Sequence, residues 1–397
     1  MAELRQNTWK LGEWYDQDYA GNVSYSAVDP AQLWMWGSGH YGALGQNDMT
    51  GSTSQRIYRS SPVQVPGTTW TPDQGGGSGF HPGTTTIAFI KTDNTLWNWG
   101  VNSNGALGQN NNQLINRSSP TQIPGTTWKY VESSSKTSFA TKTDGTLWCW
   151  GRNDRGELGQ NSRIKRSSPT QIPGTTWDVL GVGNQNVFCT KTDGTLWSWG
   201  YNGSYHRLGL LGDETQYSSP VQIPGTWSDV KQISSGWMST LVIKSDNTLW
   251  GWGGGNAGQL AQNNRSTVES PTQIAGSWSD VAAMGLQNGG IKTDGTLWMM
   301  GANTDGTLGQ GNRTYYSSPV QIPGTTWSKV SGEKNDGGEC ALATKTDGTL
   351  WAWGNNQEGQ LAQNNRTQYS SPRQVGSDTT WVDVIAGNMI VMGFKST

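Results

Sequence analysis

Short apolar runs alternate with polar, glycine-rich stretches along the whole chain, and one run is repeated. It reads Leu-Trp-x-Trp-Gly, and its copies are 48 to 63 residues apart. Side chains of an extended strand alternate between two faces, so the two Trp share one face while Leu and x share the other. The pattern predicts a strand at seven places, which start at Leu33, Leu96, Leu147, Leu196, Leu249, Leu297 and Leu350.

Other strand-like segments accompany each copy, as the unit that starts at Trp128 illustrates. Residues 128–131 and 138–142 are candidate strands, and Asp144-Gly145 separates the second of them from Leu147. Asp-Gly between two strands is typical of a hairpin, and we expect a type I′ turn with positive φ at both residues. Residues 121–123 are the predicted fourth strand, with Pro120 at its start on a sheet edge, where a missing N–H is tolerated.

Seven units of about 50 residues predict one ring rather than separate domains. A four-stranded antiparallel blade cannot bury both of its faces alone, whereas blades stacked around a ring can. We therefore predict an all-β protein, a seven-bladed β-propeller in which the Trp face of one blade packs over the smaller face of its neighbour. The second Trp of the repeat then forms the structural core, at Trp36, Trp99, Trp150, Trp199, Trp252 and Trp353.

Segments from the two ends of the chain are expected to close the ring. Residues 381–397 align with residues 128–144 and stop just before a Leu-Trp pattern, whose counterpart is residues 33–37. However, Trp14 precedes Leu33 by the same 19 residues that separate Trp128 from Leu147, so two segments compete for one position. We expect residues 23–397 to form the propeller and residues 1–22 to be an arm outside it that docks on another protein.

Composition narrows the classes of function. The 23 Trp residues argue against disorder, although only 14% of residues are charged. The net charge is −2 and no basic run stands out, so we expect no nucleic-acid binding. No apolar stretch reaches 18 residues, so we expect no membrane insertion. The widely spaced cysteines Cys149, Cys189 and Cys340 are expected to be reduced, buried thiols in strands.

Nothing in the sequence has the pattern of an enzyme. The three His share no spacing, the acidic residues do not cluster, and no nucleophile–base pair is visible. We therefore expect no catalytic residue, no metal site and no cofactor. The amides of the repeated Gly-x-Leu-Gly-Gln-Asn phrase have two interpretations. They line a groove for a glycan, or they satisfy the backbone of their own loops, and we favour the second.

Loops that differ between blades are the candidate contact sites, because loops on a rigid scaffold carry function. Three stand out: the insertion between Trp70 and Ile87, the loop of residues 201–216 that loses the Gln-Asn phrase, and the polar loop of residues 331–339. Together with the N-terminal arm, they supply the candidate residues for contact with a protein partner. These are Trp9, Trp14, Tyr15, Phe80, His81, Tyr205, His206, Lys334 and Asn335.

The repeated phrase LWxWGxNxxGxLGQN, followed by SPxQI and a W-x-x-V strand, resembles the regulator-of-chromosome-condensation repeat family over about residues 24–397. Members of that family are seven-bladed propellers, so the resemblance implies the fold predicted above. Roles in the family include nucleotide exchange on a small GTPase, chromatin binding, light sensing and inhibition of enzymes. The chain departs from the family in one phrase, because Gly-x-x-His-Thr has no His here, as in KTSFAT and QNVFCT.

Low charge and near-identical repeats rich in amides and glycine resemble the members of this family encoded by bacteriophages. That resemblance implies a non-enzymatic virion component, such as a capsid decoration, fibre or tail protein. Its partners would be other virion subunits or the host surface. The alternative is a soluble, cytoplasmic protein-binding adaptor with the same propeller.

Overall fold

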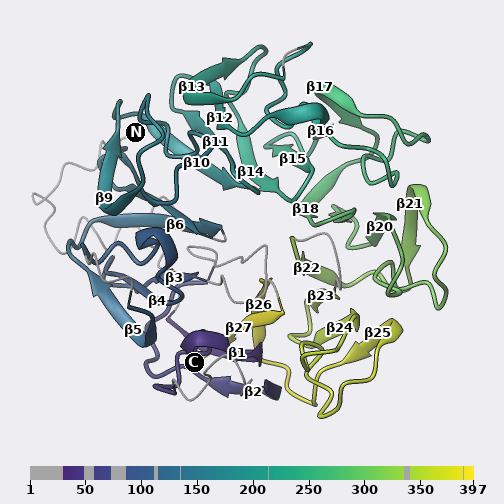
Figure 1. Ribbon diagram of the computed structural model, residues 1–397. Helices are drawn as coiled ribbons and strands as arrows, with labels where there is room; N and C mark the ends of the chain where they lie inside the picture. Colours follow the sequence, from purple (N-terminus) through teal and green to yellow (C-terminus); the bar gives the residue numbers. More distant parts are fainter. Residues whose placement is uncertain are drawn as a thin grey trace, which may run out of the picture.

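Seven antiparallel β-sheets surround a central axis in the computed structural model (Figure 1). The structure describes residues 30–48, 58–72, 86–110, 115–134, 136–212, 214–334, 340–387 and 389–397. Six sheets have four described strands each, and the sheet of β3, β4 and β5 has three. The prediction of an all-β, seven-bladed propeller with antiparallel blades is confirmed.

We number the blades along the chain and count the strands of each blade outward from the axis. Blade 1 contains β26 (Trp381–Ala386), β27 (Ile390–Ser396), β1 (Ala31–Ser38) and β2 (Tyr58–Gln64). Blade 2 contains β3 (Thr86–Ile90), β4 (Leu96–Gly100) and β5 (Arg117–Ile123), which correspond to the second, third and fourth strands of the other blades. Blade 3 contains β6 (Trp128–Ser134), β7 (Thr137–Lys142), β8 (Leu147–Gly151) and β9 (Arg166–Ile172), and blade 4 contains β10 (Trp177–Val182), β11 (Asn186–Lys191), β12 (Leu196–Gly200) and β13 (Tyr217–Ile223).

The remaining blades repeat this order. Blade 5 contains β14 (Val230–Ser235), β15 (Ser239–Lys244), β16 (Leu249–Gly253) and β17 (Val268–Ile274). Blade 6 contains β18 (Trp278–Ala283), β19 (Gln287–Lys292), β20 (Leu297–Gly301) and β21 (Tyr316–Ile322), and blade 7 contains β22 (Trp327–Gly332), β23 (Cys340–Lys345), β24 (Leu350–Gly354) and β25 (Tyr369–Gln374). Three short 3-10 helices follow third strands, namely η1 (His40–Gly42), η2 (Ser103–Gly105) and η3 (Gly203–Tyr205).

The hydrophobic core lies between blades, where the predicted Trp face meets the face of Leu and x. Leu96 and Ile123 of blade 2 share one buried cluster with Trp128 and Trp150 of blade 3. The Trp150 indole also donates from Nε1 to a carbonyl oxygen of blade 2, that of Ala106, at 2.8 Å. The predicted packing of blade on blade is confirmed. All the predicted core tryptophans are fully buried, namely Trp36, Trp99, Trp150, Trp199, Trp252 and Trp353.

The Asp-Gly hairpins form as expected, but the prediction of a type I′ turn was wrong. Gly145 has a φ of 76°, whereas Asp144 is not among the residues with positive φ. The Gly145 N–H donates to the Lys142 carbonyl at 3.0 Å, and Lys142 in turn donates to Thr146 at 2.9 Å. This is a three-residue loop, in which a type I turn is followed by one left-handed residue. The Asp144 carboxylate accepts hydrogen bonds from both the N–H and the hydroxyl of Thr146, which favours this turn.

The fourth strand was also assigned to the wrong blade. The blade that starts at Trp128 ends with β9, and residues 121–123 belong to β5 of the preceding blade. Pro120 lies inside β5 rather than at its start, at a point where the register with β4 shifts between Asn98 and Gly100. A proline is accommodated there because the outermost strand is an edge and the bulge leaves its nitrogen outside the ladder.

Blade 1 closes the ring with strands from both ends of the chain. Its order is β2-β1-β27-β26, and β27 pairs with β1 from Ala31 opposite Ser396 to Gly37 opposite Ile390. The predicted closure is confirmed. The C-terminal strands occupy the inner positions of blade 1, which the sequence pattern also allowed for the segment around Trp14. Residues 1–22 lie outside the described residues, so the docking role of the arm stays a prediction.

Candidate binding surfaces

The propeller has two rims with different chemistry, because consecutive strands of each blade run antiparallel. One rim carries the loops between first and second strands and between third and fourth strands, and we call it the loop rim. The other rim carries the Asp-Gly turns and the links between blades, and we call it the turn rim. A hydrogen bond of 2.8 Å from the Arg152 N–H to the Lys136 carbonyl joins two loops of blade 3 on the loop rim.

Amide side chains of the repeated phrase hold the loops of the loop rim in shape. Asn153 accepts from the Leu158 N–H through Oδ1, and its Nδ2 donates to the carbonyls of Ser162 and Ile164. Gln160 donates from Nε2 to the Gln171 carbonyl at 3.0 Å. These bonds satisfy backbone groups that the turns leave open, which supports the structural interpretation of the amides over a glycan groove.

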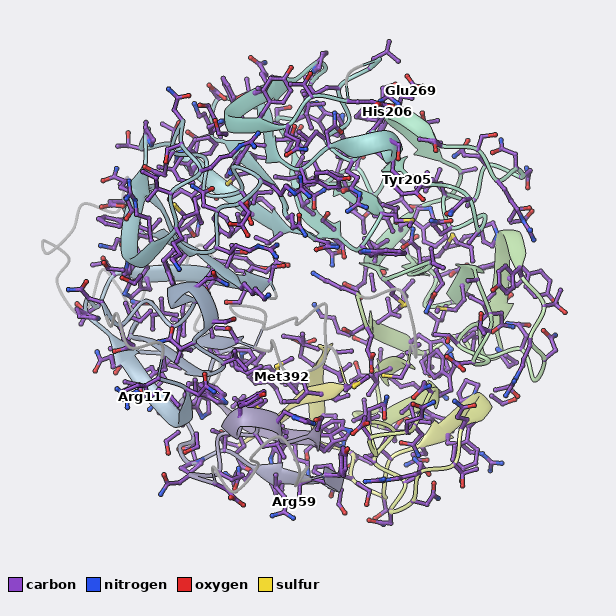
Figure 2. The ribbon with its side chains drawn as sticks, in the orientation of Figure 1. Arg59, Arg117, Tyr205, His206, Glu269 and Met392 are labelled. Atoms are coloured by element: carbon purple, nitrogen blue, oxygen red, sulfur yellow. The ribbon has the colours of Figure 1, made fainter. Side chains whose placement is uncertain are left out.

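The loop of blade 4 differs from the others and brings Tyr205 and His206 to the loop rim (Figure 2). The His206 Nε2 lies 3.8 Å from Oε1 of Glu214 and 3.7 Å from Oε1 of Glu269. The guanidinium of Arg207 is buried under this loop, 5.6 Å from the centroid of the Tyr205 ring. Burial lowers the pKa of Arg207 below its ordinary value. Leu211 follows on the same loop and is 75% exposed.

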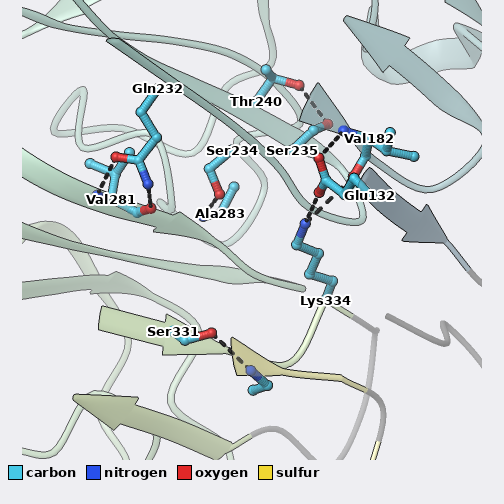
Figure 3. Close-up of polar contacts among 11 residues, drawn as sticks. Glu132, Val182, Gln232, Ser234, Ser235, Thr240, Val281, Ala283, Ser331 and Lys334 are labelled. Carbon is cyan, nitrogen blue, oxygen red and sulfur yellow. Dashed lines mark hydrogen bonds and ion pairs between the residues drawn. The ribbon is translucent and has the colours of Figure 1, made fainter. Parts of the chain in front are cut away.

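Innermost strands line a central cavity of about 680 Å³, whose walls include β6, β10, β14, β18, β22 and β26. Side chains of one blade satisfy backbone N–H groups of the next (Figure 3). Glu132 accepts from the Val182 N–H, Ser234 from Ala283, and Ser331 from Ala386, at 2.9 to 3.0 Å. The free edges of the innermost strands are thereby hydrogen-bonded around much of the ring.

Lys334, one of the predicted contact residues, reaches across this cavity from blade 7. Its Nζ lies 2.9 Å from Oε1 of Glu132 in blade 3 and 3.5 Å from the Val182 carbonyl in blade 4 (Figure 3). The Lys334 side chain is only 17% exposed. Lys334 therefore connects opposite blades at the loop-rim end of the cavity, and its ammonium group is already engaged.

A Lys side chain lies between two Trp rings in every blade, at the turn rim. In blade 3, the Lys142 Nζ is 4.7 Å from the centroid of the Trp128 ring and 4.3 Å from that of Trp148. Blade 1 builds the same arrangement from both ends of the chain, with Lys395 between Trp34 and Trp381. Each cation–π contact stabilises by about 0.5–1 kcal/mol at an exposed site. The other lysines are Lys91, Lys191, Lys244, Lys292 and Lys345.

The turn rim also repeats a chain of hydrogen bonds from indole to hydroxyl to carboxylate. Trp148 donates from Nε1 to the Thr146 Oγ1 at 2.8 Å, and this hydroxyl donates to the Asp144 Oδ1 at 2.7 Å. The hydrogen bond from the Thr side chain holds the pKa of the Asp below its ordinary value in six blades. These residues are Asp93, Asp144, Asp193, Asp246, Asp294 and Asp347.

We expect acid to destabilise the propeller through these six turns. A carboxyl whose pKa is lower in the folded state stabilises fully above its unfolded pKa, about 3.9, and this stability is lost as pH falls through the folded values. The melting temperature should therefore fall below about pH 4 as these carboxylates are protonated. Replacement of all six Asp by Asn keeps the acceptor but removes the charge, so the slope between about pH 4 and 2 should decrease. Equal slopes for both proteins would contradict the assignment.

The structure brings together only some of the predicted contact residues. Tyr205 and His206 share one loop on the loop rim, while Lys334 lies at the central cavity. The others, Trp9, Trp14, Tyr15, Phe80, His81 and Asn335, lie outside the described residues. Sequence reasoning missed Ile164 and Leu211, which are exposed on the loop rim. The run of Arg163, Lys165 and Arg166 around Ile164 was a local signal that the overall charge balance concealed.

The structure also bears on thiols, metals and membranes. Cys149, Cys189 and Cys340 are buried thiols in strands, as predicted, and burial raises the pKa of the Cys149 thiol to about 12. Within the described ranges, no three His, Cys, Asp or Glu side chains are grouped so as to hold a metal ion. No helix in the described part of the chain is long and apolar enough to cross a membrane.

Comparisons with known proteins place the chain in a family. Ultraviolet-B receptor UVR8 of Arabidopsis thaliana is 25% identical over 193 residues, 47% of this chain and 43% of UVR8. The E3 ubiquitin-protein ligase HERC2 of Homo sapiens is 24% identical over 391 residues, 94% of this chain but only 8% of HERC2. Thus the chain spans less than half of either relative.

The crystal structure of yeast RCC1 (Prp20) bound to Kap60 has the same fold. It matches with a TM-score of 0.77 at 18% identity, over 96% of this chain and 91% of that chain. The family model described as RCC1-like domain matches residues 32–393, from the first closure strand to the last. With seven blades, a repeated Leu-Trp strand and a ring closed by both ends, the chain belongs to the RCC1-like domain family.

Proposed function

We propose that this chain is a non-enzymatic, protein-binding propeller that presents its loop rim to a partner. One observation carries the proposal. Of the five large hydrophobic side chains exposed among the described residues, four lie on loops between third and fourth strands, and the fifth, Val382, lies on the innermost strand of blade 1. The four are Ile115, Ile164, Leu211 and Tyr315, with exposures of 40%, 63%, 75% and 39%.

Exposed apolar side chains that share one rim of a rigid disc offer the loops of that rim, rather than the other rim, as a contact surface. The buried Trp core and the hydrogen-bonded innermost strands hold the loops in fixed positions, so little order has to be gained on binding. The relatives support the same class of function. Prp20 was crystallised bound to Kap60, and UVR8 is a receptor, although what they bind is a property of those proteins.

Affinity capture with matched variants tests the proposal. The full chain is used as bait in an extract of the source cells, and mass spectrometry identifies the proteins that bind. Serine at Ile115, Ile164, Leu211 and Tyr315 should abolish capture of a defined partner, while V382S should capture it as the unaltered chain does. Capture of the same proteins by both variants would place the interface elsewhere, and reproducible capture of nothing would contradict a binding function.

A virion component is the second candidate, and composition is what favours it. The repeats are nearly identical, rich in Gly and amides, and low in charge, as in the bacteriophage members of the family. The relatives named above are from a plant, human and yeast, which supports an adaptor inside the cell better than a virion protein. Mass spectrometry of purified particles from the source decides between them, because a virion component copurifies in fixed proportion to the capsid protein.

A further inference from the structure

Blade 3 carries a local concentration of positive charge on the loop rim. Residues 163–166 read Arg-Ile-Lys-Arg, directly before and into β9. Arg163 and Lys165 are exposed, Arg166 is half-buried, and Ile164 between them is 63% exposed. We call residues 163–166 the basic loop. The chain as a whole has a net charge of −2, so this segment differs in sign from the protein that carries it.

The backbone of the basic loop is fixed although its side chains are exposed. Asn153 donates from Nδ2 to the Ile164 carbonyl at 3.0 Å and to the Ser162 carbonyl at 2.9 Å. The Ile164 N–H donates to the Ser162 hydroxyl at 3.0 Å. Both polar groups of the Ile164 backbone are therefore satisfied inside the protein. The isoleucine side chain is held outward by a rigid turn rather than exposed by a loose one.

Equivalent arginines on three other blades are engaged by the following blade. Arg265 lies 5.7 Å from the centroid of the Tyr315 ring, and Arg366 lies 4.1 Å from that of Tyr58. Arg313 donates to Oε1 of Gln368 at 3.5 Å. Arg163 occupies the equivalent position in blade 3. In blade 4, the position that corresponds to these partner residues is held by Gln216, and the described residues give Arg163 no such contact.

The acidic groups near the basic loop do not neutralise it. Glu157 is buried, where it binds the Arg152 side chain at 2.9 Å and the Arg155 N–H at 2.7 Å. Among the described residues, no carboxylate lies within ion-pair distance of Arg163, Lys165 or Arg166. Three cationic residues and one exposed isoleucine thus occupy four consecutive positions, and no ion pair with an acid is found for any of the three among the described residues.

We infer that the basic loop docks an acidic polypeptide segment that places an apolar side chain against Ile164. This site rests on the proposed function and specifies the chemistry of the partner. Charge complementarity selects an acidic ligand and speeds its encounter. A polypeptide fits better than a nucleic acid, because phosphate backbones are bound by extended sets of Lys and Arg, whereas here the cations frame a single exposed isoleucine.

Selection of peptides on the intact protein tests the inference. A displayed library of random 12-residue peptides is panned on the full chain, and the selected peptides are synthesised with a fluorescent label for anisotropy titrations. Enriched sequences should contain several Asp or Glu around a Leu, Ile, Phe or Trp. R163E/K165E should weaken their binding by about tenfold or more, since attraction becomes repulsion. I164S should weaken it by several-fold through lost apolar contact.

Charge reversal at the equivalent arginines of two other blades is the control. R265E/R313E changes two equivalent arginines on blades 5 and 6 and should leave peptide affinity unchanged. The inference is overturned if the enriched peptides are not acidic or if R163E/K165E binds them as tightly as the unaltered chain. The affinity capture from cell extract tests the loop rim as a whole, not the basic loop alone. A captured partner that still binds R163E/K165E would therefore support the proposed function and contradict this site.

Two further probes separate other sources of negative charge. A labelled 20-base-pair DNA duplex and vesicles containing phosphatidylserine are titrated with the same four proteins, the unaltered chain and the three variants. We expect neither to bind as tightly as the selected peptides at physiological salt. If the duplex or the vesicles bind more tightly and R163E/K165E abolishes that binding, the ligand is a nucleic acid or a membrane surface, and the peptide proposal is wrong.

Discussion

Replacement of Trp199 by alanine should lower the free energy of unfolding by about 3–5 kcal/mol, the cost of deleting a large buried aromatic side chain. The Trp199 ring is fully buried between blades 3 and 4. Its centroid lies 5.9 Å from that of Trp177 and 6.5 Å from that of Phe139, both in edge-on geometry. Its Nε1 donates to the Glu157 carbonyl at 2.8 Å, so the mutation removes packing and one bond between blades.

Urea denaturation followed by tryptophan fluorescence measures this loss. W199F is the matched control, because it keeps an aromatic ring between the blades and loses the indole N–H. Its cost should be nearer the one or two kcal/mol of an unsatisfied carbonyl and a smaller ring. If W199A unfolded within about 1 kcal/mol of the unaltered chain, the blades would not depend on this ring for their contact.

Sequence periodicity was sufficient to predict the fold because every repeat has the same alternation of large and small side chains, which predicts how one blade packs on the next. Alternation in Leu-Trp-x-Trp predicts which side chains share a face, and the small size of x in most copies predicts where a neighbouring Trp fits. Cys149 and Ser198 illustrate this, since both occupy x, between the two Trp of the pattern, and both are fully buried. Seven copies together specify a ring that no single copy could indicate.

Local turn chemistry and strand pairing were harder to predict. Asp-Gly is compatible with several hairpins, and the choice depends on hydrogen bonds to a residue outside the pair, Thr146. The fourth strand was misassigned because β5 and β9 have the same sequence pattern, Arg-Ser-Ser-Pro-Thr-Gln-Ile. A pattern present once in each repeat predicts a strand but does not say whether it closes one unit or opens the next.

Surface chemistry was predicted least well. Lys334 was chosen because its loop is polar and unusual, yet its ammonium group binds Glu132 across the cavity. Exposure of Ile164 depends on the two bonds that Asn153 makes to the loop, and these cannot be inferred from the sequence of blade 3 alone. Residues that differ between blades mark candidates, but their pairing with the next blade decides which of them remain available to a partner.

Removal of residues 381–397 should abolish the cooperative fold, because blade 1 loses its two inner strands. Six large side chains leave the core, and burial of each stabilises by about 1.5–3 kcal/mol. Their sum, roughly 9–18 kcal/mol, is as large as the whole net stability of most domains, about 5–15 kcal/mol. Circular dichroism and size-exclusion chromatography should show an unfolded or aggregated product. The six are Trp381, Val384, Ile390, Val391, Met392 and Phe394.

A circular permutant distinguishes loss of the strands from loss of the chain end. In blade 1, the strand register places Lys395 opposite Gln32. In blade 3, Lys142 is hydrogen-bonded to Thr146 in the same way, and the Thr-Asp-Gly turn of residues 143–145 joins them. The same three-residue turn can therefore join Lys395 to Gln32. The permutant starts at residue 377, runs from Lys395 through this turn to Gln32 and ends at residue 376, so it lacks residues 1–31 and 396–397. Its reference is residues 31–397, and the matching deletion is residues 31–380. It should melt at or above the temperature of the reference, because a hairpin replaces an open end. If it failed to fold while residues 31–380 folded cooperatively, the pairing of β1 with β27 would not be what closes the ring.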